Sequence, residues 1–303
     1  MSDPFSPLPD LLTTKEVAEL LRIKQRKVYE LVSAGQIPVS RVTGKLLFPR
    51  DLVEAWVRAQ AYADGGFEHL KERPAVLAGS HDPLLEWALR ESGSEIATFF
   101  DSSLDGLRRV AEGRALAAGL HVYEPEHWGN GDWNINHVRR GAPGLPLVLV
   151  QWAKRQQGLI LPAGNPLGIA GLQDLAGKIV IPRQKDSGSH LLFEHLRREA
   201  KLHPDEIRLL PKPARSETDL ALAVAEGRAD AGFGVESVAR QQRLDFLPLW
   251  VERFDLLVWR HEYFEPPVQK LLAFARSKRF AQRAKELRGY LLHDHGEVHY
   301  NGP

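Results

Sequence analysis

Residues 12–57 carry signals for two helices joined by a short turn, and this stretch constrains the fold more than any other part of the chain. Thr13 and Glu16 have the spacing of a capping box, so a helix is expected to begin at Thr14. A second helix is expected over residues 25–34, where a glycine and then a proline end it. Two helices linked in this way predict a helix-turn-helix unit.

A hairpin and a third helix are expected to follow directly. Residues 39–42 and 45–48 form two short extended runs, and Gly44 between them supplies the positive φ that a tight hairpin needs. The third helix is expected over residues 50–62. The hairpin completes the pattern of a winged helix-turn-helix, and we place this domain at residues 1–62.

The stretch from residue 22 to residue 50 is strongly basic, with seven basic residues against a single glutamate and therefore a net charge of +6. A recognition helix places its N-terminal end in the major groove, while a basic hairpin reaches phosphates or the minor groove. Double-stranded DNA is therefore the first expected partner. The basic residues are Arg22, Lys24, Arg26, Lys27, Arg41, Lys45 and Arg50.

This segment resembles the excisionase-like winged-helix family, which is related to MerR-type domains. The matching motifs are Thr-x-Glu-Val-Ala-x-Leu-Leu at 14–21, Val-Tyr-x-Leu at 28–31, Gly-x-Ile-Pro at 35–38 and Phe-Pro-Arg-Asp at 48–51. The resemblance implies a set of DNA-facing residues on the second helix and on the wing. They are Lys24, Gln25, Arg26, Lys27 and Tyr29 on the helix, and Arg41 and Lys45 on the wing.

The whole chain has 303 residues, of which 43% are hydrophobic and 26% charged, and this composition is typical of a globular protein with two or three cores. No apolar run approaches the length that spans a bilayer, and the first residues lack the pattern of a signal peptide. We therefore expect a cytoplasmic protein without a membrane partner. The absence of cysteine excludes disulfides, thiolate metal sites and a cysteine nucleophile.

Downstream of an expected linker at 63–74, strands and helices alternate, which predicts an α/β domain with helices covering parallel sheets. This domain is placed at residues 75–303 and divided into two lobes. The chain is expected to cross between the lobes near 150–165 and again near 250–260, with separate extended segments at 147–151 and 158–162.

Three loops between a strand and a helix carry serine at the start of the helix. A helix N-terminus offers free amides and a positive dipole end, so hydroxyls there favour an anion. Each serine alone could simply cap its helix, but the loops are expected to meet in the crevice between the lobes, where such folds bind ligands. The serines are Ser80, Ser102, Ser103, Ser187 and Ser189.

Residues 75–290 also resemble a type II periplasmic binding protein domain, of the molybdate-binding-like kind found in cytoplasmic regulators. Among the matching motifs are Gly-Ser-His-Asp at 79–82, Arg-Gln at 183–184, Ser-Gly-Ser at 187–189 and Gly-Arg-Ala-Asp-Ala-Gly-Phe-Gly at 227–234. The resemblance implies molybdate or tungstate as the effector. Asp186 and His190 stand where the family motif has glycine and arginine, so a different small organic or sulfur-containing anion is the alternative.

Further candidates near the expected crevice are two arginines and three histidines. Arg183 and Arg155 could bind an anion through the guanidinium fork, or form salt bridges between the lobes. His81, His121 and His190 could contact the ligand or serve as hydrogen-bonded structural residues. The histidine-containing tail at 293–299 is expected to be a mobile terminus rather than a metal site.

Together these patterns predict a ligand-responsive transcriptional regulator, acting as a homodimer on paired half-sites, with no catalytic residues, metal or cofactor. An enzyme on a two-lobed α/β scaffold is one alternative, but no nucleophile with its base and no metal motif can be assembled. An architectural DNA-binding factor of the excisionase kind is the other. Such a factor needs no second domain of this size.

Overall fold

The computed structural model describes residues 11–42, 44–60, 73–125 and 133–302, and it divides the chain into two compact units, Met1–Phe67 and Glu68–Pro303. Most of the linker expected at 63–74 lies outside the described residues.

The first unit is a helix-turn-helix followed by a hairpin, which confirms the predicted winged helix. Thr13 and Glu16 form the predicted capping box, in which the Glu16 carboxylate accepts the backbone amide of Thr13 at 2.7 Å. Phe48 and Val53 are fully buried among the apolar residues of the two preceding helices. The elements are β1 (Leu11–Thr13), α1 (Thr14–Leu20), α2 (Gln25–Ser33), β2 (Ser40–Val42), β3 (Lys45–Pro49) and α3 (Arg50–Gln60).

The strand β1 is an addition that the sequence did not predict. It pairs antiparallel with β3, and the three strands have the order β1-β3-β2. Only Leu12 of this short strand is buried, so its sequence shows too little alternation to indicate a strand.

The second unit is built on one long sheet with the order β5-β4-β6-β11-β7-β10-β8-β9, and β12 and β13 also pair with β7. The outer strands are parallel, as predicted, whereas β7 and β11 run antiparallel to each other. The strands are β4 (Val76–Ser80), β5 (Ala97–Asp101), β6 (Ala117–Leu120), β7 (Leu147–Leu161), β8 (Ile179–Ile181), β9 (Arg208–Leu209), β10 (Ala231–Val235), β11 (Asp245–Trp259), β12 (Tyr290–Leu291) and β13 (Val298–Asn301).

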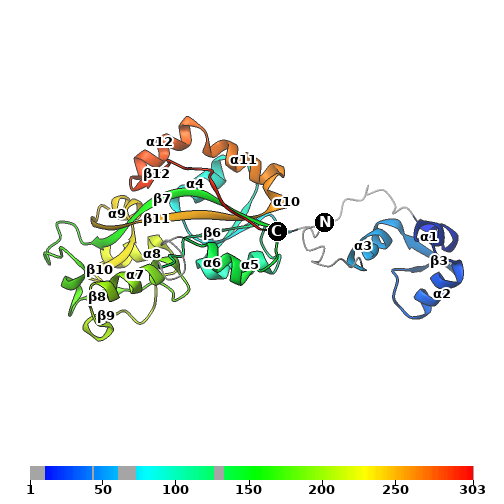
Figure 1. The fold of residues 1–303 in the computed structure, drawn as a ribbon, viewed down its shortest axis with the longest axis horizontal. Coiled ribbons are helices and arrows are strands. Elements are labelled where there is room, and N and C mark those ends of the chain that lie inside the picture. Colours follow the sequence, from blue (N-terminus) through cyan, green and yellow to red (C-terminus); the bar gives the residue numbers. More distant parts are fainter. Residues whose placement is uncertain (1–10, 43, 61–72, 126–132, 303) are drawn as a thin grey trace. The chain divides into compact units, whose positions relative to one another are not determined.

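The two long strands β7 and β11 connect the lobes (Figure 1). The prediction of separate segments at 147–151 and 158–162 is wrong, because β7 is continuous through the residues between them. Those residues include Arg155 and Gln157, both buried. A buried strand is recognised in a sequence by a continuous apolar run. In β7 that run is interrupted by polar residues that are buried between the lobes, so the sequence suggested two segments although the strand is continuous.

Helices cover both faces of the sheet in each lobe. In the first lobe, which contains β4, β5 and β6, Figure 1 shows α11 and α12 on one side of the long strands and α5 and α6 on the other. The second lobe contains β8, β9 and β10 with α7, α8 and α9. The helices are α4 (Pro83–Glu91), α5 (Ser103–Ala111), α6 (Ile135–Gly141), α7 (Gly188–Glu199), α8 (Glu217–Ala225), α9 (Glu236–Gln241), α10 (Arg260–Tyr263), α11 (Pro266–Ala275) and α12 (Lys278–Leu287).

The C-terminal tail is part of the sheet, so its expected mobility is wrong. Strand β13 pairs with the start of β7, and β12 pairs with its middle. The imidazole of His295 contacts the backbone carbonyl of Trp152 at 2.6 Å, and that of His299 contacts the side-chain oxygen of Gln151 at 3.1 Å. The tail thereby provides hydrogen-bond partners for backbone groups along one side of β7, which would otherwise be unpaired.

Candidate functional site

The exposed face of α2 presents the residues expected to contact DNA. Val28 and Val32 are buried in the core and Leu31 packs against it, so the polar side chains lie on the opposite, exposed face of α2. The side chain of Arg26 is 92% exposed, and its ion pair with Glu30 at 3.4 Å lies on the surface. Such a pair contributes little and leaves the cation available. Five expected DNA-facing residues here are exposed: Lys24, Gln25, Arg26, Lys27 and Tyr29.

The wing has the predicted hairpin geometry. Val42 pairs with Lys45 across the turn, and Gly44 has φ of +77°. Lys45 is exposed beside the turn, whereas the side chain of Arg41 lies outside the described residues. Contact of these residues with DNA stays a prediction.

Of the five candidate serines of the second unit, two cap helices and three contact other side chains. Ser102 and Ser187 cap α5 and α7, each accepting a backbone amide of its own helix at 3.2 Å. The hydroxyls of Ser80 and Ser103 lie 2.7 Å apart at the end of the first lobe facing the crevice. Ser189 lies in the second lobe, where its hydroxyl donates to Glu217 at 3.1 Å. All five are buried.

The two lobes are in contact beside these serines. The backbone amide of Leu104 donates to the carbonyl of Asp186 at 3.4 Å, and the side chain of Gln184 donates to Asp101. Gly188 packs so closely against the first lobe that a Cβ there would lie 2.4 Å from the carbonyl oxygen of His121. The structure therefore brings the serines of both lobes into one closed interface.

A chain of buried polar groups runs through this interface and includes three acids that the sequence analysis missed, Asp82, Glu217 and Glu252. Arg155 lies at its centre and donates to Asp82 at 3.0 Å and to Glu252 at 2.7 Å. Gln157 joins Glu252 to Ser189 with hydrogen bonds of 2.9 and 3.3 Å. Arg155 is thus a salt-bridging residue, one of its two predicted uses.

The charges within this buried polar network keep the carboxylate of Glu252 ionised. Burial opposes ionisation of Glu252, but the charges of Arg155 and His121 outweigh it and lower the pKa of Glu252 to about 2. Burial and the nearby Asp82 carboxylate raise the pKa of Tyr290 well above its usual value, and its hydroxyl donates to Asp82 at 2.7 Å. Charged side chains within a strand that is mostly apolar, such as Glu252 and Asp255 in β11, are the sequence signal that could have indicated this buried polar network.

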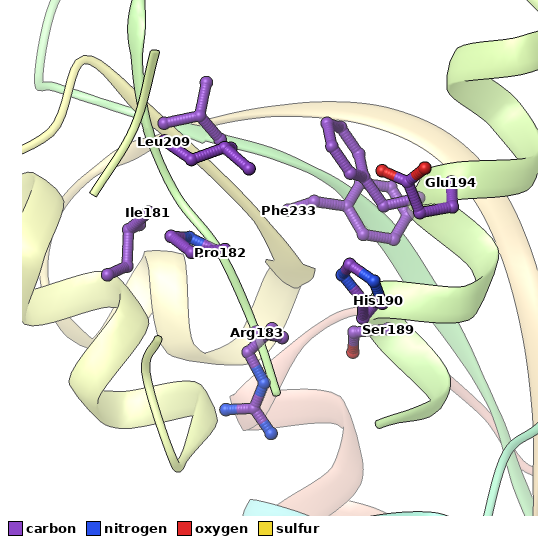
Figure 2. A pocket seen from close by; sticks show the side chains of 10 residues that line it. Ile181, Pro182, Arg183, Ser189, His190, Glu194, Leu209 and Phe233 are labelled. Atoms are coloured by element: carbon purple, nitrogen blue, oxygen red, sulfur yellow. The ribbon is translucent and has the colours of Figure 1, made fainter. Parts of the chain in front are cut away.

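Arg183 lines a small pocket in the second lobe, here named the Arg183 pocket. Figure 2 shows Ile181, Pro182 and Arg183 on one side, and Ser189, His190 and Glu194 along α7 on the other. The pocket has a volume of about 20 Å³, and apolar residues form much of its wall. These apolar residues are Val180, Ile181, Pro182, Phe193, Leu209 and Phe233.

The polar end of the Arg183 pocket contains hydrogen-bond donors that have no acceptor among the described residues. Arg183 is 5% exposed, and its nearest acid is Glu217 at 3.8 Å. Its Nε and Nη1 atoms are buried without a hydrogen-bond partner among the described residues. Burial lowers the pKa of His190, so its ring is largely neutral at pH 7. His81 does not line this pocket, and its imidazole contacts Glu86 at 3.1 Å.

Within the described part of the chain, no cluster of three or more histidine or acidic side chains is placed to hold a metal ion. None of the helices in that part is both long and apolar enough to cross a membrane.

Comparison with known proteins identifies both units. The family model described as a PBP superfamily domain matches residues 85–276, and one described as a helix-turn-helix domain matches residues 11–61. An uncharacterised Bacillus subtilis (strain 168) protein, YvgK, is 26% identical over 295 residues, which are 92% of this chain and 94% of that protein.

Solved structures share the fold of the second unit. A putative phosphate transporter substrate-binding protein from Clostridium perfringens, with bound phosphate, has a TM-score of 0.52 at 13% identity and covers 71% of this chain and 98% of its own. The sulfate-binding protein SubI from Mycobacterium tuberculosis H37Rv has a TM-score of 0.51 at 15% identity, covering 72% of this chain and 86% of its own. The chain therefore belongs to the PBP superfamily and carries a helix-turn-helix domain at its N-terminus.

Proposed function

We propose that this protein is a transcriptional regulator whose first unit binds double-stranded DNA and whose second unit binds a small effector. The observation that carries the proposal is the pairing, in one chain, of an exposed basic recognition helix with a two-lobed ligand-binding fold. A winged helix of this size makes a small interface with DNA, so we further propose that two copies bind paired half-sites.

The effector that best fits the Arg183 pocket is a small organic acid. Its anionic group would accept hydrogen bonds from Arg183, whose Nε and Nη1 are unpartnered, and its apolar body would lie against Phe193 and Phe233. A guanidinium is well suited to a carboxylate. The apolar wall gives a small organic body a favourable contact that a bare tetrahedral oxyanion could not use.

Charge also weighs against molybdate or tungstate. The buried polar chain holds the carboxylates of Asp82, Glu217 and Glu252 against the guanidiniums of Arg155 and Arg183. A bare dianion would add two charges to a region where acids already outnumber arginines. A monocarboxylate adds one charge and compensates its desolvation with apolar burial.

Effector binding must also open the pocket. A volume of about 20 Å³ admits roughly one water molecule. An organic acid would therefore bind a more open arrangement of α7 and β8, or of the lobes, and shift the population toward it. That shift is the signal that the DNA-binding unit would receive.

A thermal-shift screen of the full-length protein tests the effector class. We expect aromatic and aliphatic monocarboxylates to stabilise the protein by about 2.7 kcal/mol at a hundredfold excess over Kd, and molybdate, tungstate and sulfate to have no comparable effect. Arg183→Gln should weaken binding by about tenfold or more, since a hydrogen bond to a charged group is lost. Stabilisation by molybdate alone would contradict the proposed effector class, and carboxylate binding unaffected by Arg183→Gln would contradict the proposed pocket.

A further inference from the structure

A second and much larger opening lies between the lobes, on the side of α4, α8, α9 and α12. It is lined by residues of all four helices and has a volume of about 460 Å³, within the range of roughly 300–1,000 Å³ typical of small-molecule sites. We name it the interlobe groove and define it by His81, Glu86, Arg90, Arg240, Arg283 and Glu286. Neither Arg183 nor any of the candidate serines lines it.

Three arginines from three different helices meet in the interlobe groove. Arg90 comes from α4 of the first lobe, Arg240 from α9 of the second, and Arg283 from α12. Their side chains are 61%, 40% and 38% exposed, respectively. They are thus accessible to a solute while partly shielded from bulk water, which strengthens their attraction for an anion.

The carboxylates of the groove are already occupied. One oxygen of Glu86 accepts from Arg90 at 2.7 Å, and the other lies 3.1 Å from the imidazole of His81. The hydrogen bond from His81, and the charges of His81 and Arg90, lower the pKa of Glu86 to about 2 against the effect of burial. The two oxygens of Glu286 accept from Gln282 at 3.1 Å and from Arg283 at 3.4 Å.

The donors of the groove are in excess of these acceptors. A guanidinium has five N–H donors, and each groove arginine uses a single nitrogen in its acid contact: Nη1 of Arg90, Nε of Arg240 and Nη1 of Arg283. The Nε of Arg283 is buried with no partner in the described ranges. Each of the three guanidiniums is paired with one carboxylate, Arg240 with Glu236 at 3.1 Å, so the groove lacks hydrogen-bond acceptors rather than negative charge. Its remaining N–H donors favour a ligand whose anionic groups carry several acceptor oxygens.

We propose that the interlobe groove binds a compact small molecule carrying at least two anionic groups. One group lies against Arg90 of the first lobe, another against Arg240 of the second, and Arg283 contacts either. Such a ligand bridges the lobes and stabilises their closed arrangement. The site is separate from the Arg183 pocket, and its existence does not depend on the effector proposed there.

Calorimetry on the full-length protein tests this proposal, with citrate as a polycarboxylate probe, pyrophosphate as a phosphate probe and acetate as a monoanion. At least one of the two polyanions should bind saturably and more tightly than acetate. Arg90→Gln and Arg240→Gln should each weaken that binding by about tenfold to a hundredfold, because each removes charged hydrogen bonds. The probe that binds more tightly identifies the anionic class.

Two control variants locate the site. Arg228→Gln alters an exposed arginine paired with Glu226 at 2.7 Å outside the groove, and Arg183→Gln alters the other pocket. Both should leave polyanion binding unchanged. Absence of saturable binding up to about 10 mM of either probe, weaker than most small-molecule sites, would overturn the proposal. Equal affinity in wild type, Arg90→Gln and Arg240→Gln would also overturn it.

Discussion

The arginines of α2 and those between the lobes carry the same charge in opposite surroundings. The side chain of Arg26 is 92% exposed and has one loose partner at 3.4 Å. That of Arg155 is 1% exposed and lies between two buried acids. An exposed arginine stays hydrated and can exchange its partner for a phosphate, whereas a buried one must be paired because its desolvation is costly.

This difference separates the two tasks of the chain. Cations on α2 contribute almost nothing to folding and are free to bind a polyanion. Cations between the lobes hold Asp82, Glu217 and Glu252 in place and so decide how the lobes meet. Substitutions should therefore change stability in one region and binding in the other.

The largest effect is expected from Arg155→Ala, which leaves Asp82 and Glu252 buried without their cation. Removing one partner of a buried pair typically costs about 3–5 kcal/mol. Urea unfolding followed by tryptophan fluorescence measures the loss, since most of the 7 tryptophans lie in the second unit. Arg228→Ala, at an exposed pair, is the matched control. A loss below about 1 kcal/mol, the level of a surface pair, would contradict the role assigned to Arg155.

A somewhat smaller effect is expected from acid. The pKa of Glu252 is about 2 in the folded chain against 4.5 for the unperturbed group. A lowered pKa means that the stabilisation is complete above about pH 4.5 and is lost as pH falls toward 2. The loss is on the order of 3 kcal/mol. Unfolding free energies measured across this range should fall more steeply for wild type than for Glu252→Gln, and equal slopes would show that Glu252 is not responsible.

The smallest effect on folding is expected from Arg26→Ala, with a melting temperature within about 2 °C of wild type. Its effect should appear in DNA binding instead, where loss of one phosphate contact lowers the slope of log affinity against log salt by about 0.9. Fluorescence anisotropy at several salt concentrations, on DNA upstream of the protein's own gene, measures it. Arg208→Ala, an exposed arginine of β9, is the control. Light scattering of the same complexes tests the proposed dimer.

Local interactions explain what could be predicted from the sequence. The capping box of Thr13 and Glu16 and the turn at Gly44 involve residues within a few positions of each other. Their chemistry therefore indicates the helix start and the hairpin without knowledge of the rest of the fold. The alternation of strands and helices in the second unit is likewise set by local patterns, and it predicted the α/β class.

Long-range contacts decided what the sequence could not show. Arg155 and Asp82 are 73 positions apart, and Arg155 and Glu252 are 97 apart. No local pattern reveals that two such distant acids share one guanidinium. The same applies to the tail, where β13 completes an edge of β7 that is visible only once the sheet exists.

The sequence by itself determined the helices of the first unit, the winged-helix order, the α/β class and the serines at the starts of α5 and α7, because each depends on neighbours along the chain. Ser80 was wrongly placed at a helix start, since it ends β4 and Asp82 caps α4. Only the tertiary structure decided which of those serines cap helices, which meet other side chains, and where space remains for a ligand. The physical reason is that a cavity and a buried charge pair are properties of packing between distant segments. The Arg183 pocket and the interlobe groove exist only where the folded elements leave them.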